Sequence, residues 1–460
     1  MSVKAVGCLL LLLGCSSFAA SQYKALNPDV KRAVDGVSEE RIAGTMKKLE
    51  SFGTRNTLSA TDNPAQGIGA ARQWIFDELK SYSPRLQVSF ETYKVKKHGR
   101  IVRDVELRNV VAVLPGTNQK EHQVLISGHY DSLCIVRKKN DKGEDVMDNE
   151  ASAAAPLAPG VSDDASGTAV TMELARVLSQ YEFEKTLVFV AFVAEEQGLV
   201  GATLYAAKAK EANTLIDAVL NNDIVGNELG GSGRHADSKV NVYSDDPNDS
   251  PSRAIARYAR EIGERYVPSM RVNTVFRADR FARGGDHTPF ANEGFGAVRF
   301  TTPAEFFANQ HTTSDTFTNA SPAYVARVAR VNAAVAASLA WAPKVPVVLR
   351  RNPSTVAVNN PMAPNLTWGK SGYDALLRWT HDNPEPDLLG FAVVIRGTTA
   401  PFWEREIFVG DVREYTLPDV NIDELVLGVK AIDKAGNESP VAAYAYPAPL
   451  RKSAKWELAR

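Results

Sequence analysis

Apolar and polar positions alternate between helical and strand-like spacing along the first three quarters of the chain. Apolar residues recur every three or four positions from Ile42 to Phe52, after the candidate N-cap Ser38. Further helices are predicted at 70–79, 170–178, 200–210, 252–265 and 324–340, and strands at 86–93, 105–114, 124–128, 187–194, 240–243 and 297–301. Unbroken apolar runs such as LVFVAFVA at 187–194 are typical of strands buried on both faces. The pattern predicts an α/β domain whose mostly parallel central sheet is flanked by helices.

The pattern changes after Trp341. Residues 342–346 (APKVP) indicate a linker, and helical spacing disappears beyond it. Short strands are predicted at 376–380, 389–396, 414–417 and 425–433, separated by Pro, Gly and Asp turns. Trp379, the LGF at 389–391 and the segment from Val429 to Ser439 together resemble a fibronectin type III domain. A different small all-β sandwich is the alternative.

The N-terminus has the layout of a secretory signal. Lys4 is followed by a short apolar run and then by small residues, and Ser17-Phe18-Ala19 fits a cleavage site. The apolar run is too short to span a bilayer, which needs about 20 residues, so no transmembrane segment is predicted here. The segment from Leu12 to Cys15 also resembles a bacterial lipoprotein box, so lipidation at Cys15 is the alternative to plain cleavage. Both alternatives predict an exported protein, either secreted or periplasmic. Lipidation at Cys15 would in addition anchor it to a membrane.

The composition is that of a folded protein but does not assign a function. The chain has 460 residues with 44% hydrophobic and 23% charged content, as folded proteins do. Lys+Arg total 53 and Asp+Glu 54, so charge gives no reason to expect a nucleic-acid partner. Cys8 and Cys15 lie in the leader, which leaves Cys134 alone and predicts no internal disulfide.

Polar residues follow the predicted strands at several points. His129 comes directly after one strand, with Asp131 two residues later, where a carboxylate can orient a metal-bound imidazole. Alone, the histidine would more simply be structural. Asp163 and Asp164 stand among small residues at the start of a helix, where an acidic N-cap is the simpler interpretation and a metal ligand is the alternative.

Two adjacent acids end the most apolar strand. Glu195 and Glu196 would repel each other at a sheet edge unless a cation or a shared proton compensates. Asp223 lies at the expected end of another apolar segment, and His311 lies in a polar loop after the strand at 297–301. Two histidines and three carboxylates are a ligand set for a pair of borderline divalent ions.

These motifs, taken in order, resemble the two-zinc aminopeptidases of the bacterial leucyl aminopeptidase and aminopeptidase S/Y type. The resemblance covers residues 41–340 and rests on GHYDS, PGVSDDASG, AEEQG, NNDIVG and QHTTSD. Together with the leader and linker patterns, it predicts a division of 1–19 as signal peptide, 20–343 as zinc peptidase domain, 344–450 as fibronectin-like sandwich and 451–460 as tail.

The resemblance also implies roles for individual residues. His129 and Asp223 would bind one Zn²⁺, Glu196 and His311 a second, and Asp163 would bridge both. Glu195 would be the general base, Asp131 would orient His129, and a cis peptide would join Asp163 to Asp164. His287, in the sequence DHTPF, is expected to contact substrate without binding metal.

The implied function is removal of N-terminal residues from peptides or proteins that have a free N-terminus. Two alternatives remain. Glutaminyl-peptide cyclotransferases share the fold and motifs, but usually carry Trp before the last histidine, where this chain has Gln310. A non-catalytic peptidase-like binding protein would have lost ligands, whereas all five positions and Glu195 are intact. Residues 134–158 depart from the simplest form of the family and are expected to be a surface loop near the cleft.

Overall fold

The computed structural model describes residues 26–244, 249–277, 284–351, 362–381, 385–447, 456 and 458. The predicted signal peptide and Cys15 lie outside these residues. The chain divides into an α/β unit, which comprises residues 32–340 and the described residues after 450, and a second unit of residues 341–449 with those described before 32. The structural boundary near 340 lies close to the predicted linker, but Trp456 and Leu458, the described residues of the predicted tail, belong to the α/β unit.

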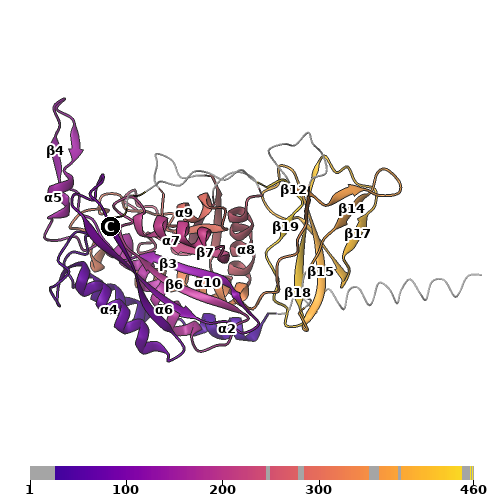
Figure 1. Ribbon diagram of the computed structural model, residues 1–460, viewed down its shortest axis with the longest axis horizontal. Helices are drawn as coiled ribbons and strands as arrows, with labels where there is room; N and C mark the ends of the chain where they lie inside the picture. The colour runs from indigo at the N-terminus through magenta and orange to yellow at the C-terminus, as the bar shows by residue number, and fades with distance from the viewer. Residues whose placement is uncertain are drawn as a thin grey trace, which may run out of the picture. The chain divides into compact units, whose positions relative to one another are not determined.

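An eight-stranded sheet forms the centre of the α/β unit (Figure 1). Its strands run in the order β1-β2-β6-β3-β7-β10-β8-β9. The strand bounds are β1 Gln87–Val95, β2 Val105–Leu114, β3 Gln119–His129, β6 Lys185–Phe192, β7 Leu215–Asn222, β8 Lys239–Ser244, β9 Arg271–Phe276 and β10 Ala297–Thr301. The four strands β6, β3, β7 and β10 pair in parallel, while β1, β2 and β8 introduce antiparallel pairs toward the edges. The prediction of a mostly parallel central sheet is confirmed.

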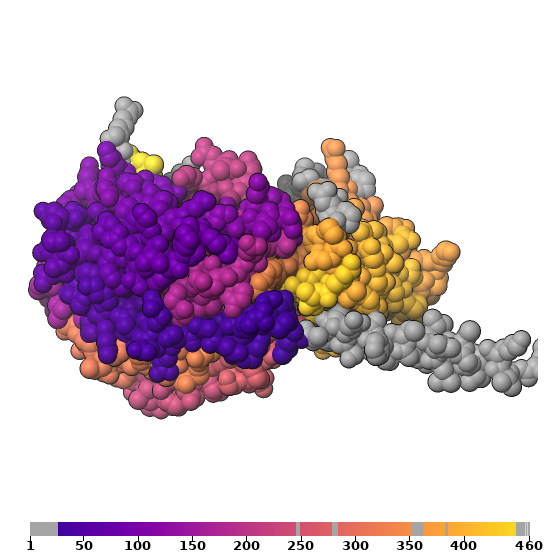
Figure 2. All heavy atoms as spheres, turned by 90° about the horizontal axis from the view of Figure 1, so that it is seen from below, coloured from indigo at the N-terminus to yellow at the C-terminus, as the bar shows by residue number. Residues whose placement is uncertain are grey.

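Helices cover both faces of this sheet. Their bounds are α2 Pro28–Asp35, α3 Glu39–Glu50, α4 Gly67–Tyr82, α5 Asn149–Ala153, α6 Ser166–Leu178, α7 Val200–Glu211, α8 Pro251–Tyr266, α9 His287–Asn292 and α10 Pro322–Trp341, with short irregular turns at Val161–Ala165 and Phe317–Asn319. Leu125 of β3 packs in one apolar cluster with Ala202 of α7 and Phe290 of α9. Gly128, three residues further along the strand, points to the opposite face and meets Gly167 of α6. In Figure 2 the N-terminal elements, indigo and purple, form much of the near surface of this unit.

Most of the predicted elements of this unit occur where the pattern placed them. Ser38 caps α3 by accepting a hydrogen bond from the backbone N–H of Arg41, and the bounds of β2 and β10 match the prediction. Residues 134–158 differ from the expected loop because they contain a two-stranded hairpin and α5. The hairpin strands, β4 Arg137–Lys139 and β5 Asp145–Met147, have only three residues each, and β4 is entirely charged, so neither stands out as a strand in the sequence.

The second unit is built from short antiparallel strands. A three-stranded sheet has the order β13-β14-β17, and a four-stranded sheet has the order β16-β15-β18-β19. The bounds are β11 Leu349–Arg351, β12 Met362–Pro364, β13 Leu366–Trp368, β14 Ala375–Arg378, β15 Leu388–Gly397, β16 Arg405–Gly410, β17 Glu414–Leu417, β18 Leu425–Asp433 and β19 Ala442–Ala443. Trp379, Phe391 and Val429 belong to one apolar core drawn from both sheets. The all-β character is as expected, and the assignment to the fibronectin type III family stays a prediction.

No helix within the described ranges is long and apolar enough to cross a membrane.

Replacement of Gly128 tests the close packing of β3 against α6. A Cβ atom on Gly128 would lie 2.4 Å from the backbone carbon of Gly167, and Gly128 directly precedes His129 in β3. We expect Gly128→Ala to lower the free energy of unfolding by about 1–3 kcal/mol, measured by urea titration, as overpacking does.

Gly44→Ala is the matched control. Gly44 lies inside α3, and its Cβ position has no heavy atom within 4 Å, so alanine there should raise the free energy of unfolding by about 0.5–1 kcal/mol. Equal stability of the two variants would contradict this account of the strand–helix contact.

Candidate metal centre

Four neighbouring parallel strands end at the same edge of the sheet, and each leads into a polar residue. His129 is the last residue of β3, Glu195 and Glu196 follow β6, and Asp223 follows β7. His311 lies in the segment after β10. The chain continues from β3 to β6 on one side and later to β7 on the other, so this edge contains the kind of crevice where open α/β sheets bind ligands.

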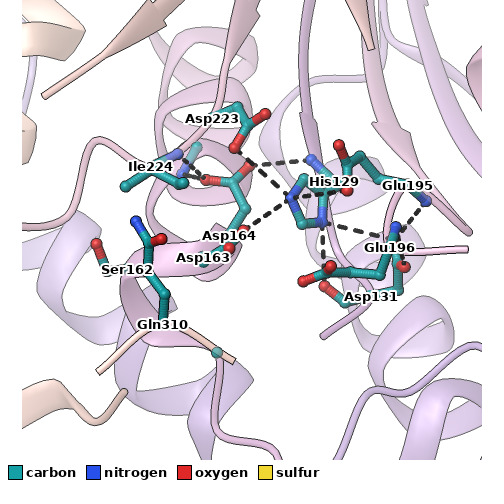
Figure 3. A network of polar contacts seen from close by, with 12 residues as sticks. His129, Asp131, Ser162, Asp163, Asp164, Glu195, Glu196, Asp223, Ile224 and Gln310 are labelled. Carbon is teal, nitrogen blue, oxygen red and sulfur yellow. Dashed lines mark hydrogen bonds and ion pairs between the residues drawn. The ribbon is translucent and has the colours of Figure 1, made fainter. Parts of the chain in front are cut away.

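His129 lies at the centre of the cluster. Its Nε2 is 3.1 Å from Asp163 Oδ1, 3.8 Å from Asp223 Oδ1 and 4.0 Å from Glu195 Oε2. In Figure 3, Asp163 and Asp223 lie on one side of the imidazole, and Glu195, Glu196 and Asp131 lie on the other. The side chain is only 1% exposed, so these carboxylates act on it with little screening by water.

Asp163 connects the two histidines. Its Oδ1 is 3.1 Å from His129 Nε2, and its Oδ2 is 3.1 Å from His311 Nε2. The peptide bond between Asp163 and Asp164 is cis, as the resemblance implied. Asp164 turns the other way and accepts hydrogen bonds from the backbone N–H groups of His129, Gly167 and Ile224. One acid of the pair therefore faces the site, while the other holds the surrounding backbone.

The adjacent carboxylates of Glu195 and Glu196 also have different surroundings. Glu196 Oε2 lies 3.1 Å from His311 Nε2, and its other oxygen, Oε1, is buried with no hydrogen-bond partner among the described residues. Glu195 is more accessible, with a side chain 15% exposed, and approaches His129. The ligand atoms form two groups, each within 4.8 Å: His129 with Glu195 and Asp223, and Asp163 with Glu196 and His311.

Asp131 differs in detail from the expectation. His129 Nδ1 lies 3.1 Å from the main-chain oxygen of Asp131 and 3.6 Å from its carboxylate, so the short contact is to the carbonyl. The carboxylate is already occupied. It accepts the backbone N–H groups of Glu195 and Glu196 and the hydroxyl of Thr57, and so positions the two glutamates instead.

Charge at the site is strongly perturbed by burial and by neighbours. Burial raises the pKa of the Glu195 carboxyl well above its usual range, and nearby acids add to the effect. The charge of Glu196 raises the pKa of His311 to about 11, against the effect of burial. Burial opposes ionisation of Asp163 too, but hydrogen bonds from His129 and His311 hold the pKa of Asp163 well below its usual value.

The residues fit a pair of divalent cations. Six carboxylate or imidazole side chains converge in two groups, and Asp163 contacts the histidine of each group. A buried oxygen of Glu196 has no hydrogen-bond partner among the described residues. A buried carboxylate without a donor is costly unless a cation satisfies it. Mixed imidazole and carboxylate ligands are those that zinc takes in catalytic sites.

A cavity of about 950 Å³ opens over this cluster. It is lined by Asp163, Glu195, Glu196, Asp223 and His311, and also by His287 at the start of α9. Burial, with the charge of Arg299, lowers the pKa of His287 to about 3, so its imidazole is neutral. Its Nδ1 is buried and has no hydrogen-bond partner among the described residues.

Three supporting residues were not found by the sequence analysis. Arg299 of β10 places Nε 3.2 Å from Asp223 Oδ2. Asp315 accepts the backbone N–H groups of Ser162 and Asp163. Arg55 donates to the main-chain oxygens of Leu49, Tyr130, Pro159 and Gly160. Asp315 lies in the QHTTSD motif and could have been singled out there, but nothing in the local pattern marks Arg55.

Comparison with known proteins identifies the family of this chain. A family model described as peptidase family M28 matches residues 109–336. A probable zinc metalloprotease of Pyricularia oryzae is 36% identical over 447 residues, which covers 90% of this chain and 83% of that protein. The chain belongs to peptidase family M28. Membership confirms the predicted class of enzyme, a zinc metallopeptidase, at the level of the family.

Solved structures of M28-like fold support the same architecture. The LapA aminopeptidase of Legionella pneumophila superposes with a TM-score of 0.52 at 20% identity, covering 69% of this chain and 76% of that one. A glutaminyl cyclase of Macrostomum lignano superposes with a TM-score of 0.50 at 15% identity, covering 67% of this chain and 91% of that one. At these identities the likeness shows the fold and does not separate the two activities.

Arg55→Ala tests how far the centre depends on its buried support. The side chain is fully buried, and its loss leaves four main-chain oxygens without these donors. We expect the free energy of unfolding to fall by about 3 kcal/mol or more, measured by urea titration. Arg41→Ala, with a side chain 46% exposed, is the control and should change it by less than about 1 kcal/mol. Similar losses in both variants would contradict the role given to Arg55.

Proposed function

We propose that this M28 peptidase is an exported aminopeptidase that removes N-terminal residues from peptides through two zinc ions. The observation that carries the proposal is the pairing of two ligand groups through Asp163, with Glu195 beside them in the same cavity. The leader pattern of residues 1–19 is the support for export, with lipidation at Cys15 as the alternative form.

Five of the clustered residues would bind the metal ions. His129 and Asp223 would hold one zinc, Glu196 and His311 the other, and Asp163 would bridge them. When bound, zinc supplies a Lewis acid for a substrate carbonyl and lowers the pKa of bound water. Arg299, beside Asp223, and Asp131, below the two glutamates, fix the orientation of the groups that they contact.

Glu195 is the residue placed to handle the proton. It lies at the cavity, is more accessible than Glu196, and is raised in pKa by burial, as a general base working near neutral pH requires. Its carboxylate accepts the proton of the attacking water and then donates it to the nitrogen of the leaving amine. His287, which is neutral and lines the same cavity, would contact the substrate.

Glu195→Gln and His311→Ala separate catalysis from metal binding. Glu195→Gln should keep two zinc ions per chain and lose about 10²–10⁴-fold in kcat, because only the base is removed. His311→Ala should lose about one zinc per chain, because one ligand of the second group is gone. Metal analysis of purified protein and steady-state kinetics measure both. His235→Ala, on an exposed histidine, is the control. Near-normal turnover in Glu195→Gln would refute the base assignment, and an unchanged zinc content in His311→Ala would refute that ligand.

Substrate assays test the reaction itself. We expect the mature protein to cleave aminoacyl anilides and unblocked peptides, and to leave the same peptides intact when their N-terminus is acetylated. A peptide with N-terminal glutamine is assayed in parallel by mass spectrometry. Cyclisation of that glutamine without cleavage of any unblocked peptide would replace the aminopeptidase proposal with a cyclotransferase. Cleavage of acetylated peptides would indicate an endopeptidase.

A further inference from the structure

The described residues near the C-terminus lie against the α/β unit. Leu458 forms an antiparallel bridge with Val95, the last residue of β1. Trp456 and Leu458 therefore belong to the α/β unit, although they follow the second unit along the chain. The family match ends at residue 336, so this segment lies outside the region that defines the family.

Trp456 is held over the loop that carries the two glutamates. Its indole meets the ring of His98 edge-on, with centroids 5.4 Å apart. Gly198, just after Glu195-Glu196-Gln197, lies beneath it, because a Cβ atom on Gly198 would be 3.6 Å from indole Cζ2. The tight turn that carries His98 is itself tied to this loop, since Arg100 donates to the main-chain oxygen of Glu196 at 2.7 Å.

The indole presents carbon to the substrate cavity. Trp456 lines the same cavity as Glu195, Asp223 and His311. Its Nε1 is shut off from solvent and has no hydrogen-bond partner in the described part of the chain, so the exposed part of the ring is apolar. Leu199 and Phe307, the latter 66% exposed, add further apolar surface around a floor of carboxylates.

We propose that Trp456 is a specificity-determining residue, supplied to the active site by the C-terminal segment, that packs against an apolar side chain of the peptide's N-terminal residue. The inference rests on the proposed aminopeptidase function. It makes the end of the chain part of the substrate pocket, so a peptidase that lacks this segment would keep its metal ligands and lose part of its discrimination. A flat ring over a wide cavity buries more apolar area against a large apolar side chain than against a methyl group, so it favours binding of the larger side chain.

Kinetics on the full-length protein test the role of the indole. We expect Trp456→Ala to raise KM about tenfold for leucyl and phenylalanyl anilides and less than about twofold for the alanyl anilide. kcat and zinc content should stay unchanged. Trp456→Phe, which keeps an aromatic ring, should recover most of the loss and guards against a folding defect in the alanine variant. Trp368→Ala removes a tryptophan that is 65% exposed in the second unit and should leave all three KM values as they are.

Several results would overturn the inference. These are unchanged KM values in Trp456→Ala, an equal rise for leucyl and alanyl substrates, or a loss of zinc. If the wild type cleaves no aminoacyl anilide, the proposed function fails, and calorimetric binding of L-leucinamide and L-alaninamide still tests Trp456. Selective weakening of L-leucinamide binding in Trp456→Ala would then support the indole contact. Equal weakening, or no binding of L-leucinamide to the wild type, would overturn it.

Discussion

Confinement of several carboxylates around two imidazoles is the constraint on which the site depends. Asp163, Glu196 and Asp223 are each less than 10% exposed, and Asp163 contacts both histidines. Like charges at this separation with little water are stable only if cations or protons neutralise them. The raised pKa values of Glu195 and His311 mean that both groups favour their protonated forms, which reduces the net negative charge of the cluster. A pair of divalent ions, as proposed, would neutralise these carboxylates.

The fold meets this constraint by dividing adjacent acids between two tasks. Asp163 faces the centre while Asp164 binds backbone N–H groups, and Glu196 faces His311 while Glu195 stays nearer the cavity. Beneath them, Asp131 and Asp315 accept backbone N–H groups of the segments that carry the ligands. Arg55 donates hydrogen bonds to the main-chain oxygens of Pro159 and Gly160, just before the segment that carries Asp163. The ligands are thus positioned by a second set of buried polar residues, and a shift in these would move the centre without touching a ligand.

The cavity combines this polar floor with apolar walls. Leu199 follows the glutamate loop, Phe307 precedes His311, and Trp456 comes from the far end of the chain. Segments that are distant in sequence therefore contribute to one pocket. In the proposed aminopeptidase, the strand ends at the sheet edge would hold the catalytic groups. The loops and the C-terminal segment would select among substrates, because their side chains can change without disturbing the ligands.

The sequence by itself determined the classes of elements, the parallel centre and the candidate ligand residues, because spacing of apolar residues and the acids at strand ends are local properties. The bounds of β2 and β10 and the cap at Ser38 needed nothing more. Only the tertiary structure decided which oxygen His129 meets on Asp131, that Arg55 and Arg299 support the centre, and that Trp456 reaches the cavity. Each of these depends on contacts between residues far apart along the chain. A buried arginine or a tryptophan near a terminus carries no local pattern that states what it will touch, so its role appears only when the chain is folded.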